Sequence, residues 1–315
     1  MGRPRRYHGA MLKYRLLFGP IMVALLLGLL VLDEWVDTLP GPAWMGDAGT
    51  LPPGLALLVV FLVVIALASR ELWGIIRAKR IEADPVVLAL AGVIGCLLIY
   101  VMPPGLSSAT ALAIYATVIV GVFILALVRH ALPGRTEGSV AVASVSLFAL
   151  IYLGTLPGFY LAIRHDHSAW VVAALIVITK SCDVGAYFTG RAIGRHKLVP
   201  WLSPGKTWEG LGGGVLLSAL LAAVLAWVGN TWFSGPDATV RAYPLWFAAV
   251  AGLALGLAGQ FGDLTASLFK RDAGVKDSGR SIPGFGGLLD VVDSPLVVAP
   301  LAYWLLRLLD VVAGG

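Results

Sequence analysis

Long apolar segments separated by short polar breaks run along almost the whole chain. Nine of them approach or exceed the length of about 20 residues that a helix needs to cross the hydrocarbon core of a bilayer. These segments cover residues 16–32, 54–76, 86–103, 109–128, 139–163, 168–189, 210–229, 244–269 and 289–312. Breaks such as LPGPAWMGDAGTLPPG and VMPPGLSS are rich in Gly and Pro, which interrupt helices. The pattern predicts an all-α, polytopic integral membrane helical bundle of about nine transmembrane helices.

The composition supports a membrane protein and argues against a soluble one. Hydrophobic residues make up 58% of the 315 residues and charged residues only 13%, whereas a soluble domain carries about 25% charged residues. Cys96 and Cys182 both lie in apolar segments, which indicates small buried side chains rather than disulfides or a cysteine metal site. The net charge of +5 comes from basic residues scattered through short breaks, so we expect no nucleic-acid partner.

The distribution of basic residues predicts how the chain is oriented. If the N-terminus is cytoplasmic, nineteen Lys and Arg residues fall in cytoplasmic segments and two, Arg164 and Arg241, in outer loops. This is a strong positive-inside asymmetry. No small-residue cleavage site follows the first apolar segment, so we expect a retained span rather than a signal peptide. The sequence therefore predicts a cytoplasmic N-terminus and a C-terminus on the opposite side.

Ionisable residues inside the predicted spans are the first sign of function, because such groups are costly unless they face protein, water or a metal. They fall into three groups, each on one face of its helix. The groups are Lys180, Asp183 and Tyr187 on the sixth span, Asp263, Ser267, Lys270 and Arg271 on the eighth, and Asp290 and Asp293 on the ninth. For the first group, a neutralised pair of Lys180 with Asp183 explains the pattern as well as a functional role does.

The two carboxylates of the ninth span favour a metal. Asp290 and Asp293 have no basic residue near them on their own helix, and two unpaired carboxylates on one face attract a divalent cation. Asp263 is then either a third ligand or a partner of Lys270. Oxygen ligands without Cys or His favour Mg²⁺ over Zn²⁺. We therefore expect Mg²⁺ at Asp263, Asp290 and Asp293, and we leave a second cation open.

The stretch between the last two spans concentrates charge that the rest of the chain avoids. It reads SLFKRDAGVKDSGRSIPGFGGLLDVVDS and covers residues 267–294. Four basic residues in it, Lys270, Arg271, Lys276 and Arg280, are suited to anionic oxygens such as those of phosphates.

A second polar stretch, residues 189–214, contains SPGKTWEG. It lacks the GxxxxGK[ST] pattern and follows no predicted strand, so it is not a phosphate loop. A helix that opens near Thr207 with Glu209 in its first turn would instead leave free amides for an anion.

Both stretches resemble motifs of the phosphatidate cytidylyltransferases, also called CDP-diacylglycerol synthases. The signature of that family is approximately S-x-x-K-R-x-x-x-x-K-D, a short spacer, P-G-H-G-G and D-R-x-D. The matching residues are Ser267, Lys270, Arg271, Lys276, Asp277, Pro283, Gly284, Gly286, Gly287, Asp290 and Asp293. In a second motif they are Asp183, Ala186, Tyr187, Gly190, Gly194, Ser203, Pro204, Lys206, Thr207, Glu209 and Gly210. Phe285 and Val291 replace the His and Arg of the signature.

The resemblance implies an enzyme of phospholipid biosynthesis that transfers CMP from CTP to phosphatidate and releases pyrophosphate. The implied roles are catalysis by Lys270, Arg271, Lys276 and Asp290, substrate binding by Ser203, Lys206, Thr207, Ser267 and Asp277, and Mg²⁺ binding by Asp263, Asp290 and Asp293. Residues 131–315 would carry both motifs, and residues 1–130 would form an N-terminal multispanning region of the same membrane unit.

The resemblance also implies partners and a location. The expected partners are CTP, phosphatidate or a related lipid phosphate, and membrane lipids, and a homodimer is left open. The expected location is the inner (plasma) membrane, with the active site facing the cytoplasm.

Three other functions account for part of the pattern. A related CTP-dependent enzyme would use another lipid, such as an isoprenoid-ether phosphate or a polyprenol. A cation-coupled transporter would also carry carboxylates in its spans, although the sequence has no internal repeat. A non-catalytic relative would explain Phe285 and Val291. Against that reading, a phosphate monoester is already ionised near neutral pH, so its attack needs no general base in place of the missing His.

Overall fold

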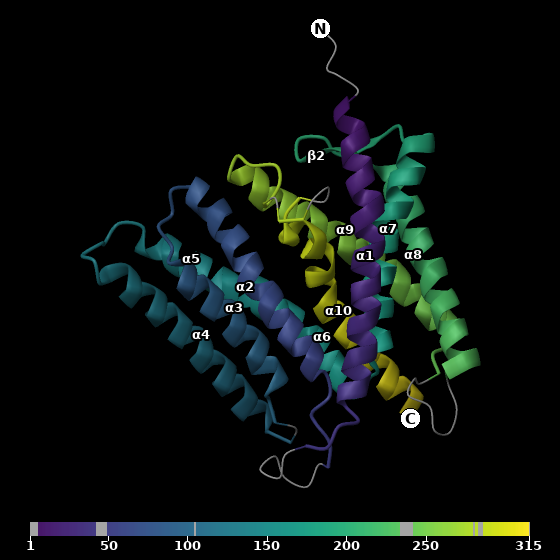
Figure 1. Ribbon diagram of the computed structural model, residues 1–315, viewed down its shortest axis with the longest axis horizontal. Helices are drawn as coiled ribbons and strands as arrows, with labels where there is room; N and C mark the ends of the chain where they lie inside the picture. The colour runs from purple at the N-terminus through teal and green to yellow at the C-terminus, as the bar shows by residue number, and fades with distance from the viewer. Residues whose placement is uncertain are drawn as a thin grey trace.

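The computed structural model describes residues 6–41, 49–103, 105–233, 242–279, 281–282 and 286–314. Helices dominate this part of the chain. They are α1 (Arg6–Val36), α2 (Leu55–Ala78), α3 (Pro85–Tyr100), α4 (Ser108–Ala131), α5 (Ser139–Ala149), α6 (Leu156–Asp166), α7 (Ala169–Ile193), α8 (Trp208–Val228), α9 (Leu245–Asp272) and α10 (Leu288–Gly314). Figure 1 shows α2 to α5 on one side of the bundle and α1, α7 and α8 on the other, with α9 and α10 between them.

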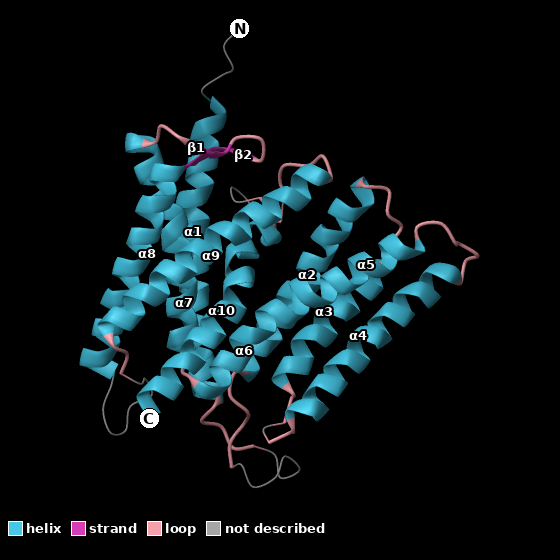
Figure 2. Cartoon of the chain, turned by 180° about the vertical axis from the view of Figure 1, so that it is seen from behind, coloured by secondary structure: helices cyan, strands magenta, loops and turns pink. Residues whose placement is uncertain are grey.

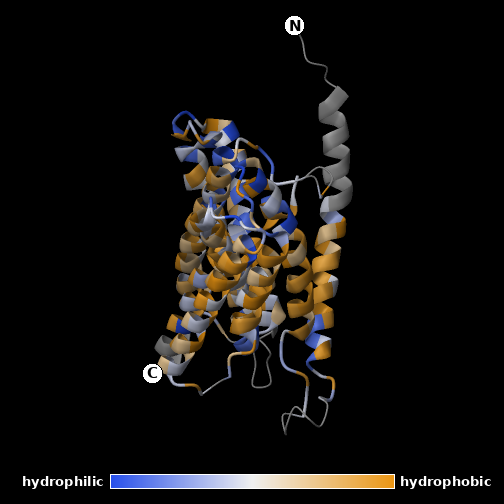
Figure 3. Ribbon diagram, turned by 90° about the vertical axis from the view of Figure 1, so that its left-hand side faces the viewer, coloured by the Kyte–Doolittle hydropathy of each residue, from blue (hydrophilic) through white to orange (hydrophobic). Residues whose placement is uncertain are grey.

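The nine predicted spans each correspond to a helical crossing. Within the described ranges, eight helical stretches are long and apolar enough to cross a membrane, and α3 is a shorter apolar helix of 16 residues. α1 begins at one end of the bundle and α10 ends at the opposite end, as an odd number of crossings requires (Figure 1). Hydrophobic residues cover the middle of the helices, and hydrophilic segments gather at the end where α1 begins (Figure 3). The chain is a multi-pass, all-α membrane protein.

One span is less regular than the sequence suggests. The predicted helix over 139–163 is present as α5 and α6, but a π-helical segment, Leu150–Thr155, joins them. The Thr155 hydroxyl donates a hydrogen bond to the Leu150 carbonyl at 3.1 Å, which closes this wider turn. Hydrophobic periodicity does not predict such a π-helical segment, because its residues are as apolar as their neighbours.

A small antiparallel hairpin interrupts the helices, although the sequence predicted no strand. β1 (Lys197–Val199) pairs with β2 (Ser203–Thr207), with Lys197 opposite Thr207 and Val199 opposite Ser203 (Figure 2). Glu209, in the first turn of α8, accepts hydrogen bonds from the backbone N–H groups of Arg195 and His196 at 3.1 Å and 3.2 Å. These bonds fix the hairpin on the start of α8.

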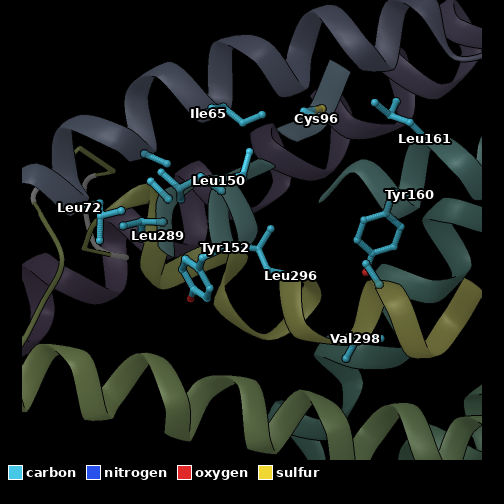
Figure 4. Packing of buried hydrophobic residues seen from close by; sticks show 14 of the residues in the cluster. Ile65, Leu72, Cys96, Leu150, Tyr152, Tyr160, Leu161, Leu289, Leu296 and Val298 are labelled. Carbon is cyan, nitrogen blue, oxygen red and sulfur yellow. The ribbon is translucent and has the colours of Figure 1, made fainter. Parts of the chain in front are cut away.

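The apolar core joins the beginning of the chain to its end. Leu72 of α2 lies beside Leu289 of α10 in the same buried cluster (Figure 4). The buried Tyr160 of α6 points toward α10, where its hydroxyl donates a hydrogen bond to the Pro295 carbonyl at 3.0 Å. The last span is therefore packed against helices of the N-terminal half.

Arg164 has a different environment from the one expected. The sequence placed it in an outer loop, but it lies in the last turn of α6 and is only 4% exposed. Its Nε is 2.6 Å from Asp33 Oδ2, and its Nη2 contacts Asp37 Oδ2. Asp33 also accepts a hydrogen bond from the backbone N–H of Leu57 at 2.9 Å. Arg164 is therefore a helix residue and not a loop residue, and it is a buried link between α1, α2 and α6.

We expect Arg164→Ala to destabilise the protein strongly. Removing one partner of a buried ion pair leaves the other charge uncompensated, which costs about 3–5 kcal/mol. Chemical unfolding of the purified protein in mixed micelles would measure this loss. Lys79→Ala is the control, because Lys79 pairs with Asp272 while the two side chains are 40% and 65% exposed, and such a surface pair contributes only about 0–1 kcal/mol. Equal losses for the two variants would contradict the role given to Arg164.

Candidate active site

A single lysine joins two of the three groups of ionisable residues. The Nζ of Lys180 on α7 lies 3.6 Å from Asp183 Oδ2 and 3.6 Å from Asp293 Oδ1, which is on α10. Asp183 also accepts a hydrogen bond from Gln260 Nε2 of α9 at 2.8 Å. The predicted pair of Lys180 with Asp183 is present, and it belongs to a larger group that spans three helices.

The remaining group of ionisable residues, which includes Asp263 on α9, lies at the same place because α9 and α10 cross closely there. Gly262 packs directly on the backbone of α10: a Cβ at this position would lie 3.1 Å from the Asp293 carbonyl oxygen. Asp263 follows Gly262 and therefore lies beside this crossing. A larger residue at 262 would push the two helices apart, so the glycine determines how closely the carboxylates of α9 and α10 approach.

The hairpin places the second motif against α9. Lys206 on β2 has its Nζ 2.5 Å from Asp263 Oδ2, and the two side chains are 17% and 30% exposed. Lys206, rather than Lys270, is thus the partner of Asp263. Thr207 is the N-cap of α8, because its Oγ1 accepts a hydrogen bond from the Gly210 N–H at 3.1 Å. This confirms the predicted helix start, and it occupies the Thr207 side chain. Ser203 is half-buried at the start of β2.

Asp290 is not free. Its Oδ1 lies 2.6 Å from Lys270 Nζ, with both side chains 12% exposed. Its Oδ2 accepts hydrogen bonds from the N–H and the hydroxyl of Ser278, at 2.9 Å and 3.0 Å, and from the Gly287 N–H at 2.9 Å. The expectation that Asp290 and Asp293 lack a cationic partner is wrong. Spacing along one helix shows only the neighbours on that helix, and the lysines come from α9 and α7.

A second buried carboxylate holds the same loop. Glu71 on α2 accepts hydrogen bonds from the Leu288 N–H at 2.8 Å and the Leu289 N–H at 2.9 Å. The Ser278 hydroxyl lies 3.0 Å from both Glu71 and Asp290, so the two carboxylates share its single proton. Glu71 also accepts a hydrogen bond from the Ser281 hydroxyl. Glu71 is 8% exposed, so these donors compensate its charge. We call the described loop residues 276–279, 281–282 and 286–287 the signature loop.

Glu71 is not among the site residues predicted from the sequence, although its position in an apolar segment indicates a role. Glu71 is a carboxylate inside the apolar window 54–76, and ionisable residues in such windows carry a role by default.

Gly287 completes the anchorage of the signature loop. A Cβ at this position would overlap the Ser278 hydroxyl and the Glu71 carboxylate. Only glycine leaves room for the two carboxylates and the serine to meet there. The spacing that carries the resemblance thus corresponds, in this chain, to a loop folded around Glu71 and Asp290.

The remaining predicted residues lie nearer to solvent. Arg271 is exposed at the end of α9, where its Nη1 donates to the Val275 carbonyl at 3.3 Å. Lys276 and Asp277 are exposed in the signature loop, and Ser267 is half-buried on α9. Arg280, Pro283, Gly284 and Phe285 lie outside the described residues. Val291 is half-buried in the first turn of α10.

The arrangement does not form a three-carboxylate metal cage. Among the described residues, no three Asp, Glu, His or Cys side chains come together in a way that would hold a metal ion. Asp290 has both oxygens occupied, so it is poorly suited to a metal. Asp263 and Asp293 each contact a single lysine from another element, Lys206 of β2 and Lys180 of α7. Mg²⁺ is commonly bound by one or two protein carboxylates and completes its coordination with water and substrate phosphates. Asp263 and Asp293 supply this number of carboxylates.

The charge balance of the group also points to an additional cation. Lys180, Lys206 and Lys270 face four aspartates, namely Asp183, Asp263, Asp290 and Asp293. The lysines are held in position, but the group as a whole has no excess of positive charge. An anionic ligand bound here would need further cations, which Arg271, Lys276 and a divalent metal are able to supply.

Comparisons with known proteins agree on one family. The model of the cytidylyltransferase family matches residues 48–309. A phosphatidate cytidylyltransferase of Bacillus subtilis is 31% identical over 267 residues, which cover 80% of this chain and 94% of that protein. One of Staphylococcus haemolyticus is 32% identical over 79% of this chain and 89% of its own length. One of Haemophilus influenzae is 40% identical over 138 residues, 43% of this chain and 46% of that protein.

We expect Glu71→Gln to loosen the signature loop. An amide nitrogen in place of one oxygen cannot accept the hydrogen bonds of the loop, and a buried N–H or hydroxyl without an acceptor costs about 1–3 kcal/mol. Trypsin cleavage after the exposed Lys276 should therefore become several-fold faster. Glu82→Gln is the matched control, because Glu82 is 63% exposed and forms an exposed ion pair with Arg135. Equal cleavage rates in wild type and Glu71→Gln would show that Glu71 does not hold the loop.

Proposed function

The chain belongs to the cytidylyltransferase family, and we propose that it transfers CMP from CTP to phosphatidate, giving CDP-diacylglycerol and pyrophosphate. The proposal rests on one observation: the hairpin and the start of α10 both contact α9 through ion pairs. Lys206 of the hairpin pairs with Asp263, and two helical turns further along α9 Lys270 pairs with Asp290, which lies in the first turn of α10 directly after the signature loop. The two lysines thus lie along one helix, as the binding of a substrate with several phosphates requires.

The proposed reaction needs alignment and charge neutralisation more than proton transfer. An oxygen of the phosphatidate phosphate attacks the α-phosphorus of CTP, and the bond from that phosphorus to the β-phosphate oxygen breaks. The attacking monoester is already ionised near neutral pH, so no side chain has to remove a proton. Negative charge accumulates on the leaving pyrophosphate, and fixed cations beside it lower the barrier.

The lysines are the groups that this structure offers for that task. Lys206 and Lys270 are 17% and 12% exposed, and each is held by one aspartate. The carboxylates hold the ammonium groups in place, so little reorganisation is needed when phosphates bind. Arg271 and Lys276 lie at the exposed end of the same helix and in the signature loop. We assign them to the pyrophosphate portion, because they are accessible from the aqueous side.

We further propose that Mg²⁺ binds together with the triphosphate at Asp263 and Asp293. When bound, it would supply Lewis-acid stabilisation of phosphate oxygens. Asp290 receives another role in this proposal: it orients Lys270 and anchors the signature loop. A second cation, like the homodimer, stays a prediction.

The lipid acceptor is supported by an apolar cavity. A cavity of about 410 Å³ lies among α1, α7, α8, α9 and α10, and its lining includes Ile178, Ala222 and Leu255. Ile178 is two residues from Lys180 on α7. An acyl chain in this cavity would leave its phosphate near the charged group. We therefore favour a lipid phosphate over a soluble acceptor, and we place the reaction at the cytoplasmic side of the plasma membrane, where CTP is available.

The transporter reading has less support. Coupling ions commonly bind at broken helices near the middle of the membrane, whereas α7 and α9 are continuous through Asp183 and Asp263.

The decisive assay uses purified protein in detergent with labelled CTP and a panel of lipid phosphates. We expect Mg²⁺-dependent formation of CDP-diacylglycerol from phosphatidate and stoichiometric release of pyrophosphate. An isoprenoid-ether phosphate and a polyprenol serve as competing acceptors, and a faster reaction with either would change the substrate. Absence of any CDP-lipid, together with ion flux into proteoliposomes, would favour the transporter.

The two aspartates of α10 should respond differently to substitution. Asp293→Asn should lower turnover at least about 100-fold, or about 2.7 kcal/mol, and should raise the Mg²⁺ concentration needed for half-maximal rate, with trypsin cleavage at Lys276 unchanged. Asp290→Asn should lower turnover and also speed that cleavage, because it releases Ser278 and Gly287. If Asp293→Asn retains near-full turnover, the metal assignment is wrong. If Asp290→Asn leaves the loop as resistant as in wild type, its anchoring role is wrong.

A further inference from the structure

A large cavity lies away from the candidate active site. Its volume is about 1020 Å³, and it is open to one side and lined by the end of α2, the start of α3, the end of α4 and the start of α5. None of the residues assigned above to the reaction lines it. Its charged lining consists of Arg77, Arg80, Arg129, Arg135, Glu82 and Asp84.

The charges of this lining do not balance. Arg129 donates two hydrogen bonds to Asp84 Oδ2, at 3.0 Å and 2.7 Å, and Arg135 lies 2.9 Å from Glu82. Partial burial raises the pKa of Asp84, but its hydrogen bonds with Arg129 and the Val86 N–H outweigh this and hold the pKa below its ordinary value. Both acidic residues are thus already paired with arginines.

Two further arginines have no acidic partner within the described residues. Arg77 has its guanidinium over the Trp73 ring, 5.1 Å from the ring centroid, and Arg80 forms no ion pair in this part of the chain. The lining therefore carries an excess of positive charge, which favours an anionic ligand.

Arg80 stands where the backbone favours glycine. It follows the C-cap Lys79 of α2 with φ +60°, the left-handed region. The N–H of Arg80 donates to the Arg77 carbonyl at 2.9 Å, and the N–H of Ile81 to the Ile76 carbonyl at 3.4 Å, which is the pattern of a Schellman motif. Glycine is the usual residue at this position, because a side chain there costs conformational energy. An arginine in this strained conformation indicates that its guanidinium is used.

His130 provides an independent sign of a ligand. It lines the same cavity and is 6% exposed. Its Nε2 lies 2.8 Å from the Glu137 carbonyl and must donate to it, so Nδ1 is the remaining polar atom. That Nδ1 is buried and has no hydrogen-bond partner among the described residues. A buried polar atom without a partner commonly marks the place of a missing ligand or water.

The rest of the lining is apolar and includes Val87, Ala126, Leu132 and Val142. A ligand that fills the cavity must therefore carry both an anionic group and hydrocarbon. The cavity also lies at the polar end of the bundle that holds the signature loop, since Lys79, between Arg77 and Arg80, pairs with Asp272 at the end of α9 at 2.8 Å. Lipid headgroups lie at this depth, and basic cavities between transmembrane helices bind anionic headgroups.

We propose that this cavity binds an anionic phospholipid, with the headgroup phosphate between Arg77 and Arg80 and part of an acyl chain along Val87 and Val142. The bound lipid is a ligand of the α2–α5 half of the bundle and is distinct from the acceptor of the reaction. The proposal concerns binding and does not depend on the proposed catalytic function.

Native mass spectrometry of the full-length protein in detergent tests the proposal. Phosphatidylglycerol is titrated as the anionic probe and phosphatidylcholine as the zwitterionic one. We expect wild type to retain phosphatidylglycerol preferentially, and Arg77→Gln and Arg80→Gly each to weaken its binding at least about tenfold, or about 1.4 kcal/mol. Arg80→Gly should unfold at the same or a higher temperature than wild type, because glycine relieves the left-handed residue.

Arg70→Gln is the matched control, because Arg70 is an exposed residue of α2 that does not line the cavity. It should bind phosphatidylglycerol within about twofold of wild type, far less than one factor of ten in the binding constant. Equal retention of the two lipids, or an equal loss in Arg70→Gln, overturns the proposal. So does a response to inorganic phosphate that Arg77→Gln abolishes while phosphatidylglycerol shows no specific binding, since the ligand would then be a free phosphate.

Discussion

Ionisable side chains inside an apolar bundle must have partners, and this constraint shapes the whole protein. A buried charge without compensation costs several kcal/mol, so each carboxylate in the helices requires a donor from another element. Asp33 pairs with Arg164, Asp263 with Lys206, and Asp290 with Lys270. Each pair joins two different elements, and Asp33 and Arg164 are 131 residues apart in the sequence. The charged groups therefore act as specific contacts in a bundle whose apolar surfaces would otherwise allow many arrangements.

The helices could be predicted from the sequence, because long apolar segments leave the chain few alternatives inside a membrane. The nine predicted windows all correspond to helices, and the start of α8 at Thr207 follows from its capping chemistry. The hairpin of β1 and β2 could not be predicted, since it is short and polar and depends on Glu209 for its attachment. The π-helical segment before Thr155 likewise leaves no mark in the hydrophobic pattern.

The sequence predicted which residues belong to the candidate site, but not how they pair. The spacing of Asp263, Lys270 and Asp290 identified residues that do lie together, but not which of them pair. A helical repeat describes neighbours on one helix, whereas the lysine partners of Asp263, Asp290 and Asp293 all come from other elements. Two carboxylates that looked free in the sequence are matched in the structure. Glu71 was missed for the same reason, because its donors are some 200 residues away along the chain.

The matched charges have a consequence for how an anionic substrate would be held. A cluster of free lysines would attract phosphates strongly, but it would be unstable in an apolar bundle without them. Pairing Lys206 with Asp263 and Lys270 with Asp290 stabilises the empty site and keeps the cations oriented. The same pairing removes the excess of positive charge, so the site cannot by itself balance a triphosphate. The missing charge has to come from exposed groups such as Arg271 and Lys276, or from a cation that accompanies the substrate. A site of this kind gains its full electrostatic strength only when the nucleotide is bound, which limits the cost of keeping charge inside the membrane.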